Sequence, residues 1–432
     1  MQVTISMLQS GDELISSQGK VYRVIALLGS GGQGEVYEVE SEGKHYALKW
    51  YHEHMATLRQ REIIEKLVEN GSPDIRFLWP MDRINGKRTF GYIMALRPNR
   101  YKSIVDLMKR KAEPSFWALC TAGYELADCF QKLHSLGYSY CDISFGNAFL
   151  DPERGEVLIC DNDNVVVTGL SKSGVEGTLG FMAPEIVMGK TGPKAETDLY
   201  SLAILLFYMF MLHHPLEGAR EADIKCFDAV AKQEIYGRTP LFIWDPQDKS
   251  NRPIAGYQEN AIIYWNLYPK FIKDLFITAF TEGLHNPNRR IVENQWKRAF
   301  IRLRNSILQC PSCGVENFYR ESDQIGAGNI CWCCNKNINK PPSIQIGSTF
   351  VVLGKETELL AHHLYDNFDM QTVIAKVSQH PKDPTKWGLN NVTDKEWIWI
   401  KPDGTKSAVL PDKNAPLLKG SRIDFGGVEG QF

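Results

Sequence analysis

The chain has 432 residues, more than one ordinary hydrophobic core accommodates, so we expect two or three domains. Hydrophobic residues make up 43% and charged residues 23%, as in ordinary globular proteins, and the net charge of −2 argues against nucleic acid as a partner. The first twenty residues lack a basic start followed by an apolar run. The longest apolar stretch, residues 201–212, is shorter than the about twenty residues that span a bilayer, so we expect no signal peptide and no membrane partner.

The first two-thirds of the chain changes from strand-like to helical patterns. The strand-like segments carry β-branched, aromatic or alternating apolar residues between glycine-containing turns; they are residues 21–28, 35–40 and 45–51. Apolar residues then recur at helical spacing. We therefore expect a small β-rich lobe over about residues 20–97, followed by a larger helical lobe over about residues 98–306.

A glycine-rich segment joins the first two strand-like segments. It has the pattern G-x-G-x-x-G-x-V, and the residues that we expect to contact a nucleotide in it are Leu28, Gly29, Ser30, Gly31, Gly32, Gln33, Gly34 and Val36. Glycine lets the backbone turn sharply and approach phosphate groups closely. A dinucleotide-binding loop would open a helix, whereas a β-like segment follows here. An ordinary glycine-rich hairpin turn fits the pattern equally well when it is taken alone.

A lysine on the next strand-like segment strengthens the nucleotide interpretation. Lys49 follows Ala47 and stands twenty residues after Gly29, a spacing at which its ammonium group can reach the α- and β-phosphates. Its expected partner is a glutamate on the following helical segment, where Glu62 and Glu65 are both candidates. We prefer Glu62 because of its distance along the chain to the turn at residues 73–75. Alternatively, either glutamate is simply a solvent-exposed charge on the helix.

Three polar residues in the middle of the chain have the spacing of a phosphoryl-transfer site. Asp142 and Asn147 stand five residues apart, and Asp161 follows an apolar segment at residues 157–159. In such sites one aspartate accepts the proton of the substrate hydroxyl, while an asparagine and a second aspartate bind magnesium. We assign the base to Asp142 and the magnesium ligands to Asn147 and Asp161.

In this order, the segments resemble the eukaryotic-like (Hanks-type) serine/threonine protein kinase family. Further motifs of that family are matched by G-T-L-G-F-M-A-P-E at residues 177–185, T-D-L-Y-S-L at 197–202 and P-N-R-R at 287–290. The resemblance implies an α+β bilobal protein kinase fold over residues 1–306. It also implies ATP and Mg²⁺ as cofactors, and protein Ser/Thr hydroxyls, including those of the chain itself, as acceptors.

The same resemblance assigns further contacts by alignment. Met94 would guard the adenine pocket, although plain core packing is its alternative, and Ala95 to Arg97 would present backbone hydrogen bonds to adenine. Arg290 would pair with Glu185.

Several residues depart from the family pattern. Tyr140 and Cys141 replace the histidine and arginine before the catalytic aspartate, which indicates a non-RD kinase that does not require activation-loop phosphorylation. Ser144 replaces a lysine that contacts the γ-phosphate, so the transition state has one fewer cation. Asn162 and Asp163 replace phenylalanine and glycine, which removes the hydrophobic anchor of the usual switch. A pseudokinase scaffold that binds nucleotide and docks partners is the alternative.

Half of the ten cysteines lie within residues 310–334. Two C-x2-C pairs separated by 17 residues form a zinc pattern, and we expect Cys310, Cys313, Cys331 and Cys334 to bind one structural Zn²⁺ in a zinc ribbon over residues 307–340. Free thiols or a redox pair are the alternative, and Cys333 is an ambiguous ligand. The clustering points to a reducing compartment, and we expect a cytoplasmic protein.

The last part of the chain, residues 344–432, alternates short apolar runs with turns and predicts an all-β sandwich. Segments at 352–356, 387–391 and 420–426 resemble the forkhead-associated domain. Lys355 replaces the phosphate-binding arginine of that family, and lysine cannot make a bidentate phosphate contact. We therefore expect a protein-docking module without phosphate recognition, and phosphothreonine binding is the alternative. The order of kinase, zinc ribbon and forkhead-associated-like domain resembles bacterial kinases of tellurite-resistance-associated systems. That resemblance implies a PP2C-type phosphatase and a von Willebrand A-type protein as partners.

Overall fold

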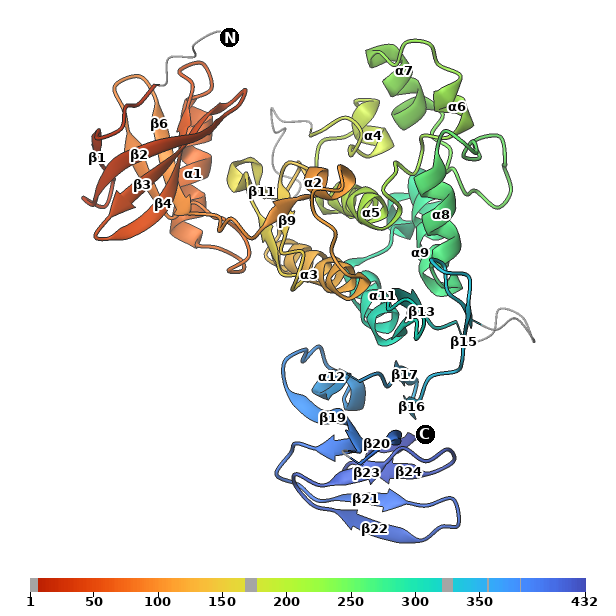
Figure 1. The fold of residues 1–432 in the computed structure, drawn as a ribbon. Helices are drawn as coiled ribbons and strands as arrows, with labels where there is room; N and C mark the ends of the chain where they lie inside the picture. The colour runs from red at the N-terminus through yellow and green to blue at the C-terminus, as the bar shows by residue number, and fades with distance from the viewer. Residues whose placement is uncertain (1–6, 168–176, 321–328, 356, 381) are drawn as a thin grey trace. The chain divides into compact units, whose positions relative to one another are not determined.

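A computed structural model of the chain describes residues 7–167, 177–320, 329–355, 357–380 and 382–432. The chain packs into two compact units. The first comprises Met1–Asn266 with Lys273–Lys297, and the second comprises Leu267–Ile272 with Arg298–Phe432. The first unit begins with strands and continues with helices, as the sequence predicts (Figure 1).

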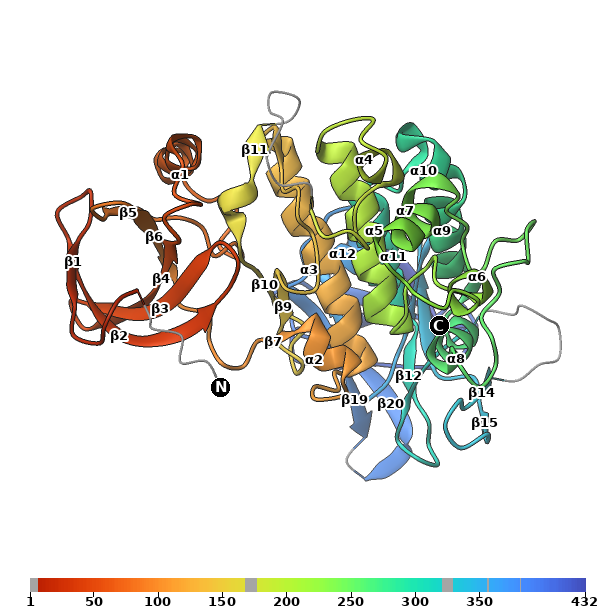
Figure 2. The same ribbon diagram turned by 90° about the horizontal axis from the view of Figure 1, so that it is seen from above.

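The small lobe of the first unit is a six-stranded antiparallel sheet in the order β1-β2-β3-β4-β6-β5. Its strands are β1 (Glu13–Ile15), β2 (Val21–Ser30), β3 (Gly34–Ser41), β4 (Lys44–Tyr51), β5 (Asp82–Asn85) and β6 (Phe90–Ala95). The alternating apolar side chains of these strands meet in one cluster that includes Val24, Val39 and Leu48. Figure 2 shows the sheet curving around this interior, with helix α1 (Leu58–Asn70) beside it.

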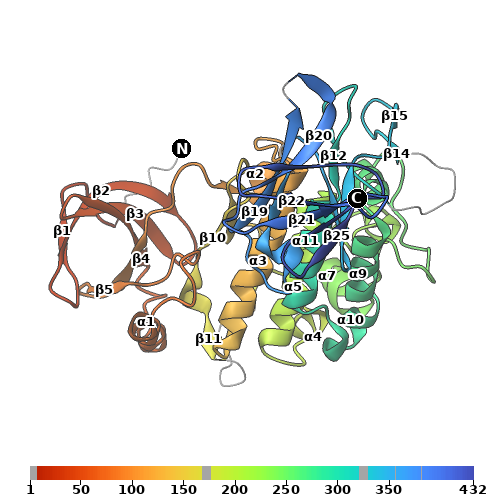
Figure 3. The same ribbon diagram turned by 90° about the horizontal axis from the view of Figure 1, so that it is seen from below.

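The large lobe is built around two long helices, α3 (Phe116–Ser135) and α5 (Ala195–Met211), which lie side by side (Figures 2 and 3). Residues 201–212 largely form the end of α5, a buried core helix as predicted, with Leu202, Leu205 and Leu206 fully buried. The short elements that precede α5 are β7 (Lys102–Ser103), α2 (Ile104–Met108), β8 (Tyr138–Ser139), β9 (Ala148–Leu150), β10 (Val157–Ile159), η1 (Asn162–Asn164), β11 (Val166–Val167) and α4 (Pro184–Val187).

Short helices continue the chain after α5. They are α6 (Ala219–Ala222), α7 (Ala229–Gln233), η2 (Glu234–Arg238), α8 (Glu259–Leu267), α9 (Lys270–Phe280), α10 (Glu282–His285), η3 (Pro287–Arg289) and α11 (Glu293–Asn305). Within the described ranges, none of the helices combines the length and the apolar character that a membrane crossing requires.

The second unit contains two small hairpins and two larger antiparallel sheets. The hairpins pair β12 (Ile307–Gln309) with β13 (Glu316–Phe318), and β14 (Asn329–Ile330) with β15 (Asn337–Ile338). The six-stranded sheet has the order β17-β16-β25-β24-β21-β22, and the four-stranded sheet has the order β18-β19-β20-β23. One apolar core draws residues from both sheets, including Ile344, Leu389 and Trp397, so the predicted all-β arrangement is present.

The remaining elements of the second unit have these bounds: β16 (Ser343–Ile346), β17 (Thr349–Val352), β18 (Glu358–Leu360), α12 (Ala361–Leu364), β19 (Val373–His380), β20 (Asp383–Asn391), β21 (Trp397–Ile400), β22 (Lys406–Val409), β23 (Asn414–Pro416), β24 (Arg422–Asp424) and β25 (Glu429–Gln431).

Candidate active site and metal centre

The loop between β8 and β9 carries the predicted base. The Oγ1 hydroxyl of Thr178 donates a hydrogen bond to Asp142 Oδ1 at 2.9 Å. The Nδ2 group of Asn147 donates to the Asp142 backbone oxygen at 2.8 Å and to its Oδ2 at 3.1 Å. Burial raises the pKa of Asp142, and the hydrogen bonds from Thr178 and Asn147 oppose that rise. The structure therefore brings Asn147 and Thr178 together around the carboxylate of Asp142.

The same loop is held from the first turn of α5. Asp198 accepts hydrogen bonds from the backbone amides of Tyr140 at 2.6 Å and of Cys141 at 3.0 Å. Cys141 adopts a left-handed backbone conformation, with φ of 72°. These contacts use backbone groups of the loop, so they do not depend on the histidine and arginine that residues 140 and 141 replace.

A buried histidine supports Asp198, and the sequence reading missed it. His134, in the last turn of α3, lies 3.1 Å from Asp198 Oδ2 through its Nε2 atom and contacts Glu293 Oε1 through Nδ1. Burial lowers the pKa of His134, but the two carboxylates outweigh burial and raise it to about 9. The only signal in the sequence was a histidine at the end of an apolar helix, a few residues before Asp142.

Lys49 lies on β4 with its side chain almost fully buried. Its Nζ donates hydrogen bonds to Gln33 Oε1 at 2.7 Å and to Asp163 Oδ2 at 2.8 Å, and it lies 3.5 Å from Asp161 Oδ1. Burial lowers the pKa of Lys49, but the charges of Asp163 and Asp161 raise it above its usual value. The lysine is therefore a charged group, held between the glycine-rich loop and the segment that carries the magnesium-binding candidate.

The structure contradicts the predicted pairing of Lys49 with a glutamate of α1. Glu62 is exposed, and within the described ranges it has no recorded hydrogen bond or ion pair. Glu65 instead forms an ion pair with Arg83 at 3.0 Å. The physical reason is that residue 163, a glycine in the family pattern, here carries a carboxylate that fills the position beside the ammonium group.

The segment after β10 is anchored by a polar side chain. Asn162 is fully buried, and its Nδ2 group donates to the backbone oxygens of Leu78 at 2.9 Å and Ile159 at 3.1 Å. Asn162 stands where the family pattern has phenylalanine. Its two hydrogen bonds anchor the segment in place of that apolar side chain. Asp161 precedes η1 in a left-handed conformation with φ of 50°, and its side chain remains 40% exposed.

The oxygen atoms near Asp161 fit a hard divalent cation. The Nδ2 group of Asn147 is engaged by Asp142, so its Oδ1 atom is the acceptor that remains for a cation. Burial raises the pKa of Asp161, and repulsion by Asp163 and Asp142 raises it further, while Lys49 lowers it. A divalent cation would relieve this repulsion among carboxylates, and Mg²⁺ prefers such oxygen ligands.

The predicted adenine and loop residues occupy adjacent strands. Ala47 and Met94 are both buried and face each other as partners between β4 and β6, while Val36 is the partner of Lys49 between β3 and β4. A side chain at Gly34 would place its Cβ 2.2 Å from the backbone oxygen of Trp50, so only glycine fits there. The other predicted nucleotide contacts lie at the ends of these strands and in the turn between β2 and β3: Leu28, Gly29, Ser30, Gly31, Gly32, Gln33, Ala95 and Arg97.

The predicted pair between Glu185 and Arg290 is present. Arg290 Nη1 and Nη2 each donate to one oxygen of Glu185 at 2.9 Å, and the arginine side chain is buried. This planar bidentate contact ties the start of α4 to the segment after η3.

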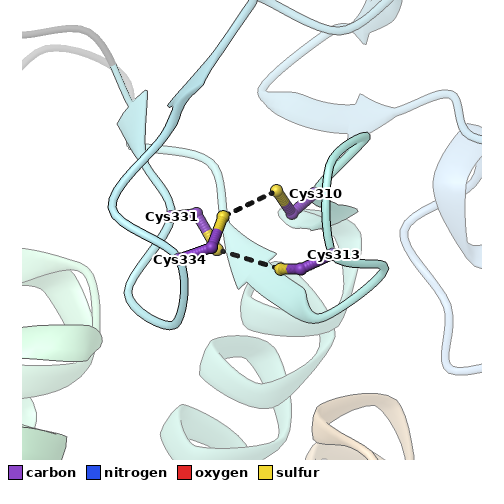
Figure 4. Close-up of side chains that lie close together, drawn as sticks. All are labelled: Cys310, Cys313, Cys331 and Cys334. Carbon is purple, nitrogen blue, oxygen red and sulfur yellow. Dashed lines mark hydrogen bonds between the residues drawn. The ribbon is translucent and has the colours of Figure 1, made fainter.

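Four cysteines of the second unit form a cluster (Figure 4). The sulfur atoms of Cys310, Cys313, Cys331 and Cys334 all lie within 4.8 Å of one another. The Sγ atoms are 3.6 Å apart both in the pair Cys310–Cys334 and in the pair Cys313–Cys331. A tetrahedral zinc site with bonds of about 2.3 Å requires sulfurs about 3.8 Å apart, so the spacing fits. Cys333 is exposed and stays outside the group.

The backbone around the cysteines favours thiolates. Gly314 and Asn335, which follow the two C-x2-C pairs, both adopt positive φ, at 75° and 57°, and so form tight turns. Burial raises the pKa of Cys331, but the backbone amides of Cys334 and Cys333 and the side-chain amide of Asn317 lower it to about 6. Zinc binds the thiolate form, so the environment of Cys331 suits a metal ligand. The backbone amide of Val315 also favours the thiolate of Cys313, but burial and hydrogen bonds with the neighbouring cysteines raise the pKa of Cys313 to about 12, and the pKa of Cys334 is raised as well.

Comparison with known proteins bears on the first unit. The protein kinase domain family matches residues 22–257, more than half of the chain. Ribosomal protein S6 kinase alpha-4 of Homo sapiens is 26% identical over 267 residues, covering 54% of this chain and 32% of the relative. Ribosomal protein S6 kinase alpha-2 of Homo sapiens is 27% identical over 295 residues, covering 60% and 38%.

A yeast protein is similar over a comparable share of the chain. The cell cycle serine/threonine-protein kinase CDC5/MSD2 of Saccharomyces cerevisiae is 25% identical over 240 residues, covering 50% of this chain and 32% of the relative. The chain spans about a third of the length of these curated relatives.

Proposed function

The chain belongs to the protein kinase family, and from this premise we propose that it is an ATP- and magnesium-dependent kinase of protein serine and threonine hydroxyls, including its own. The observation that carries the proposal is the arrangement around Asp142, whose carboxylate is fixed by Asn147 and Thr178. A carboxylate held in this way can accept a proton from a hydroxyl that approaches from solvent.

Each group has one role in the transfer. The glycine-rich loop and Lys49 hold the phosphates of ATP, and Asp142 takes the proton of the substrate hydroxyl as its oxygen bonds to the γ-phosphorus and ADP leaves. Asn147 and Asp161 would hold magnesium, which would supply positive charge to the transferred phosphoryl group. Ser144 adds no cation of its own, so this charge rests on Lys49 and the metal.

The choice of serine and threonine rests on Thr178. In the family resemblance, a threonine at this position hydrogen-bonds near the catalytic base of serine/threonine kinases, and Thr178 lies 2.9 Å from Asp142. The relatives named above are two ribosomal protein S6 kinases and a serine/threonine-protein kinase. The replacement of arginine by Cys141 supports a non-RD enzyme whose activation does not need a phosphorylated loop.

The second unit supports a regulatory role in the same proposal. The four-cysteine cluster would bind one structural zinc ion in a ribbon, and the two sheets that follow it would form a forkhead-associated-like docking domain. By resemblance of the domain order, the protein would act in the bacterial cytosol, in a signalling or stress response. Its partners there would be a PP2C-type phosphatase and a von Willebrand A-type protein.

Transfer of labelled γ-phosphate from ATP, followed by phosphosite mapping, tests the proposal. Asp142→Asn should lower the rate by about 10²–10⁴-fold. Asp82→Asn is the matched control, because Asp82 is also buried but contacts Ser17, at 3.0 Å, away from the site. If the wild-type protein transfers no phosphate and Asp142→Asn changes nothing, the enzyme proposal fails. Nucleotide binding in a thermal-shift measurement would then favour the pseudokinase scaffold, for which the replacements at Cys141 and Ser144 argue.

A further inference from the structure

The ammonium group of Lys49 has an unusual carboxylate partner. Asp163 lies in η1 and is fully buried, and its Oδ2 atom accepts hydrogen bonds from Lys49 Nζ at 2.8 Å and from the hydroxyl of Tyr51. Its Oδ1 atom is also buried and has no hydrogen-bond partner among the described residues. Lys49 is therefore the cation that compensates this buried carboxylate, and Asp163 is the closest carboxylate to that lysine.

Asp163 is also fixed from two further directions. Its neighbour Asn162 is bonded to two backbone oxygens, so the segment cannot move without breaking buried hydrogen bonds. On the opposite side, Gln60 of α1 donates through Nε2 to the Asp163 backbone oxygen at 2.8 Å and to the Tyr51 hydroxyl at 3.2 Å. Helix α1 thus contributes a neutral amide to this network, while its glutamates lie elsewhere.

The remaining contacts of Lys49 differ in character. Gln33 comes from the glycine-rich loop, and Asp161 lies 3.5 Å away with a side chain that is 40% exposed. Both groups lie where phosphates and a metal ion would bind. Among these three partners of Lys49, Asp163 alone is fully removed from solvent. It can therefore hold the lysine while the contacts of Lys49 with Gln33 and Asp161 change.

We propose that Asp163 is the positioning residue for Lys49, and that it takes over the work otherwise done by a glutamate of α1. This inference rests on the proposed kinase function, because it assigns Lys49 to the phosphates of ATP. It has a consequence for control of the enzyme: the lysine is held by a residue next to the metal-binding Asp161, so its placement does not require α1 to bring a carboxylate inward.

The test compares conservative variants of the full-length protein. Asp163→Asn keeps the shape of the side chain and removes its charge, while Glu62→Gln does the same to the glutamate predicted from the sequence. We expect Asp163→Asn to lower kcat/KM for ATP by about 10- to 100-fold without changing the KM for the protein substrate. We expect Glu62→Gln to stay within about threefold of the wild type, because Glu62 is exposed and away from the lysine.

Two measurements separate positioning from loss of folding. Asp82→Asn, at another buried aspartate, controls for the general cost of removing a buried charge, and melting temperatures are compared for all variants. The double variant Lys49→Met/Asp163→Asn should be no worse than Lys49→Met alone, since the carboxylate acts through the lysine. Additive losses in the double variant, or a loss in Glu62→Gln as large as that in Asp163→Asn, would overturn the proposal.

ATP binding, measured by titration in the presence of Mg²⁺, keeps this test separate from the test of the enzyme. If the wild-type protein binds ATP without transferring phosphate, the kinase proposal fails, and the affinities of the same variants still decide the role of Asp163. An ATP affinity that falls by about tenfold in Asp163→Asn but not in Glu62→Gln or Asp82→Asn supports it. Equal affinities in Asp163→Asn and the wild type overturn it.

Discussion

The buried histidine beneath the catalytic loop makes stability depend on pH. His134 lies between Asp198 and Glu293, and its side chain is only 10% exposed. Its pKa rises from an ordinary 6.5 to about 9, which corresponds to about 3 kcal/mol of stabilisation of the folded state. Because the folded pKa is the higher one, this stabilisation is complete below about pH 6.5 and is lost as the pH rises through about 9.

The perturbation that tests this reasoning is His134→Gln, which keeps a polar side chain and cannot become charged. We expect the variant to be less stable than the wild type by about 3 kcal/mol at pH 6, with a smaller difference at pH 9.5. Urea unfolding at both values of pH measures the difference, and His285→Gln, at an exposed histidine, is the control.

Nuclear magnetic resonance gives a direct readout of the same group. The imidazole signals of His134 should titrate with a midpoint near 9 and disappear from the spectrum of the variant. A midpoint at or below 7, or an equal difference in stability at both pH values, would refute the ion-pair argument.

Three further perturbations have expected outcomes. Thr178→Val removes the hydroxyl that donates a hydrogen bond to Asp142, so kcat/KM for phosphate transfer should fall by about tenfold or more. The melting temperature of the variant should stay unchanged, which serves as the control for folding. Metal analysis by mass spectrometry should find about one zinc ion per chain in the wild type and in Cys333→Ser, and none in Cys331→Ser. A folded wild-type protein without zinc would contradict the site. Arg290→Lys loses the bidentate contact with Glu185 and should cost about 2–4 kcal/mol in unfolding free energy, and an unchanged melting temperature would show that the pair contributes little.

The sequence was sufficient where chemistry depends on short spacing along the chain. Asp142 and Asn147 occupy one loop, so five residues of sequence already determine that they meet. The cysteine pairs are equally local, and the glycine or asparagine after each pair shows the turn that brings the two sulfurs together. Strand and helix patterns likewise predicted the order of β-rich and helical regions in the first unit.

The sequence was insufficient where the rotation of a helix decides which side chain faces the site. Glu62, Glu65 and Gln60 lie on the same helix, and its pattern of charges did not show which one faces inward. Packing against η1 turns Gln60 inward, and the carboxylate of Asp163 completes the site from a segment about a hundred residues away. Pairing between distant strands, as in the contact of β16 with β25, was hidden because no local spacing along the chain encodes it.

The departures at Tyr140 and Cys141 fall where the backbone, and not the side chain, makes the essential contact. The amides of Tyr140 and Cys141 bind Asp198, and the left-handed conformation at Cys141 follows from the path of the loop. A change of side chain at these positions leaves both hydrogen bonds in place, so the catalytic loop retains its shape without the usual histidine and arginine. At Asp163 the logic is reversed, because the new side chain adds a charge that the buried lysine requires. Loss of the histidine and arginine before Asp142 therefore leaves the shape of the catalytic loop intact, whereas Ser144 removes a cation that contacts the γ-phosphate in the family pattern.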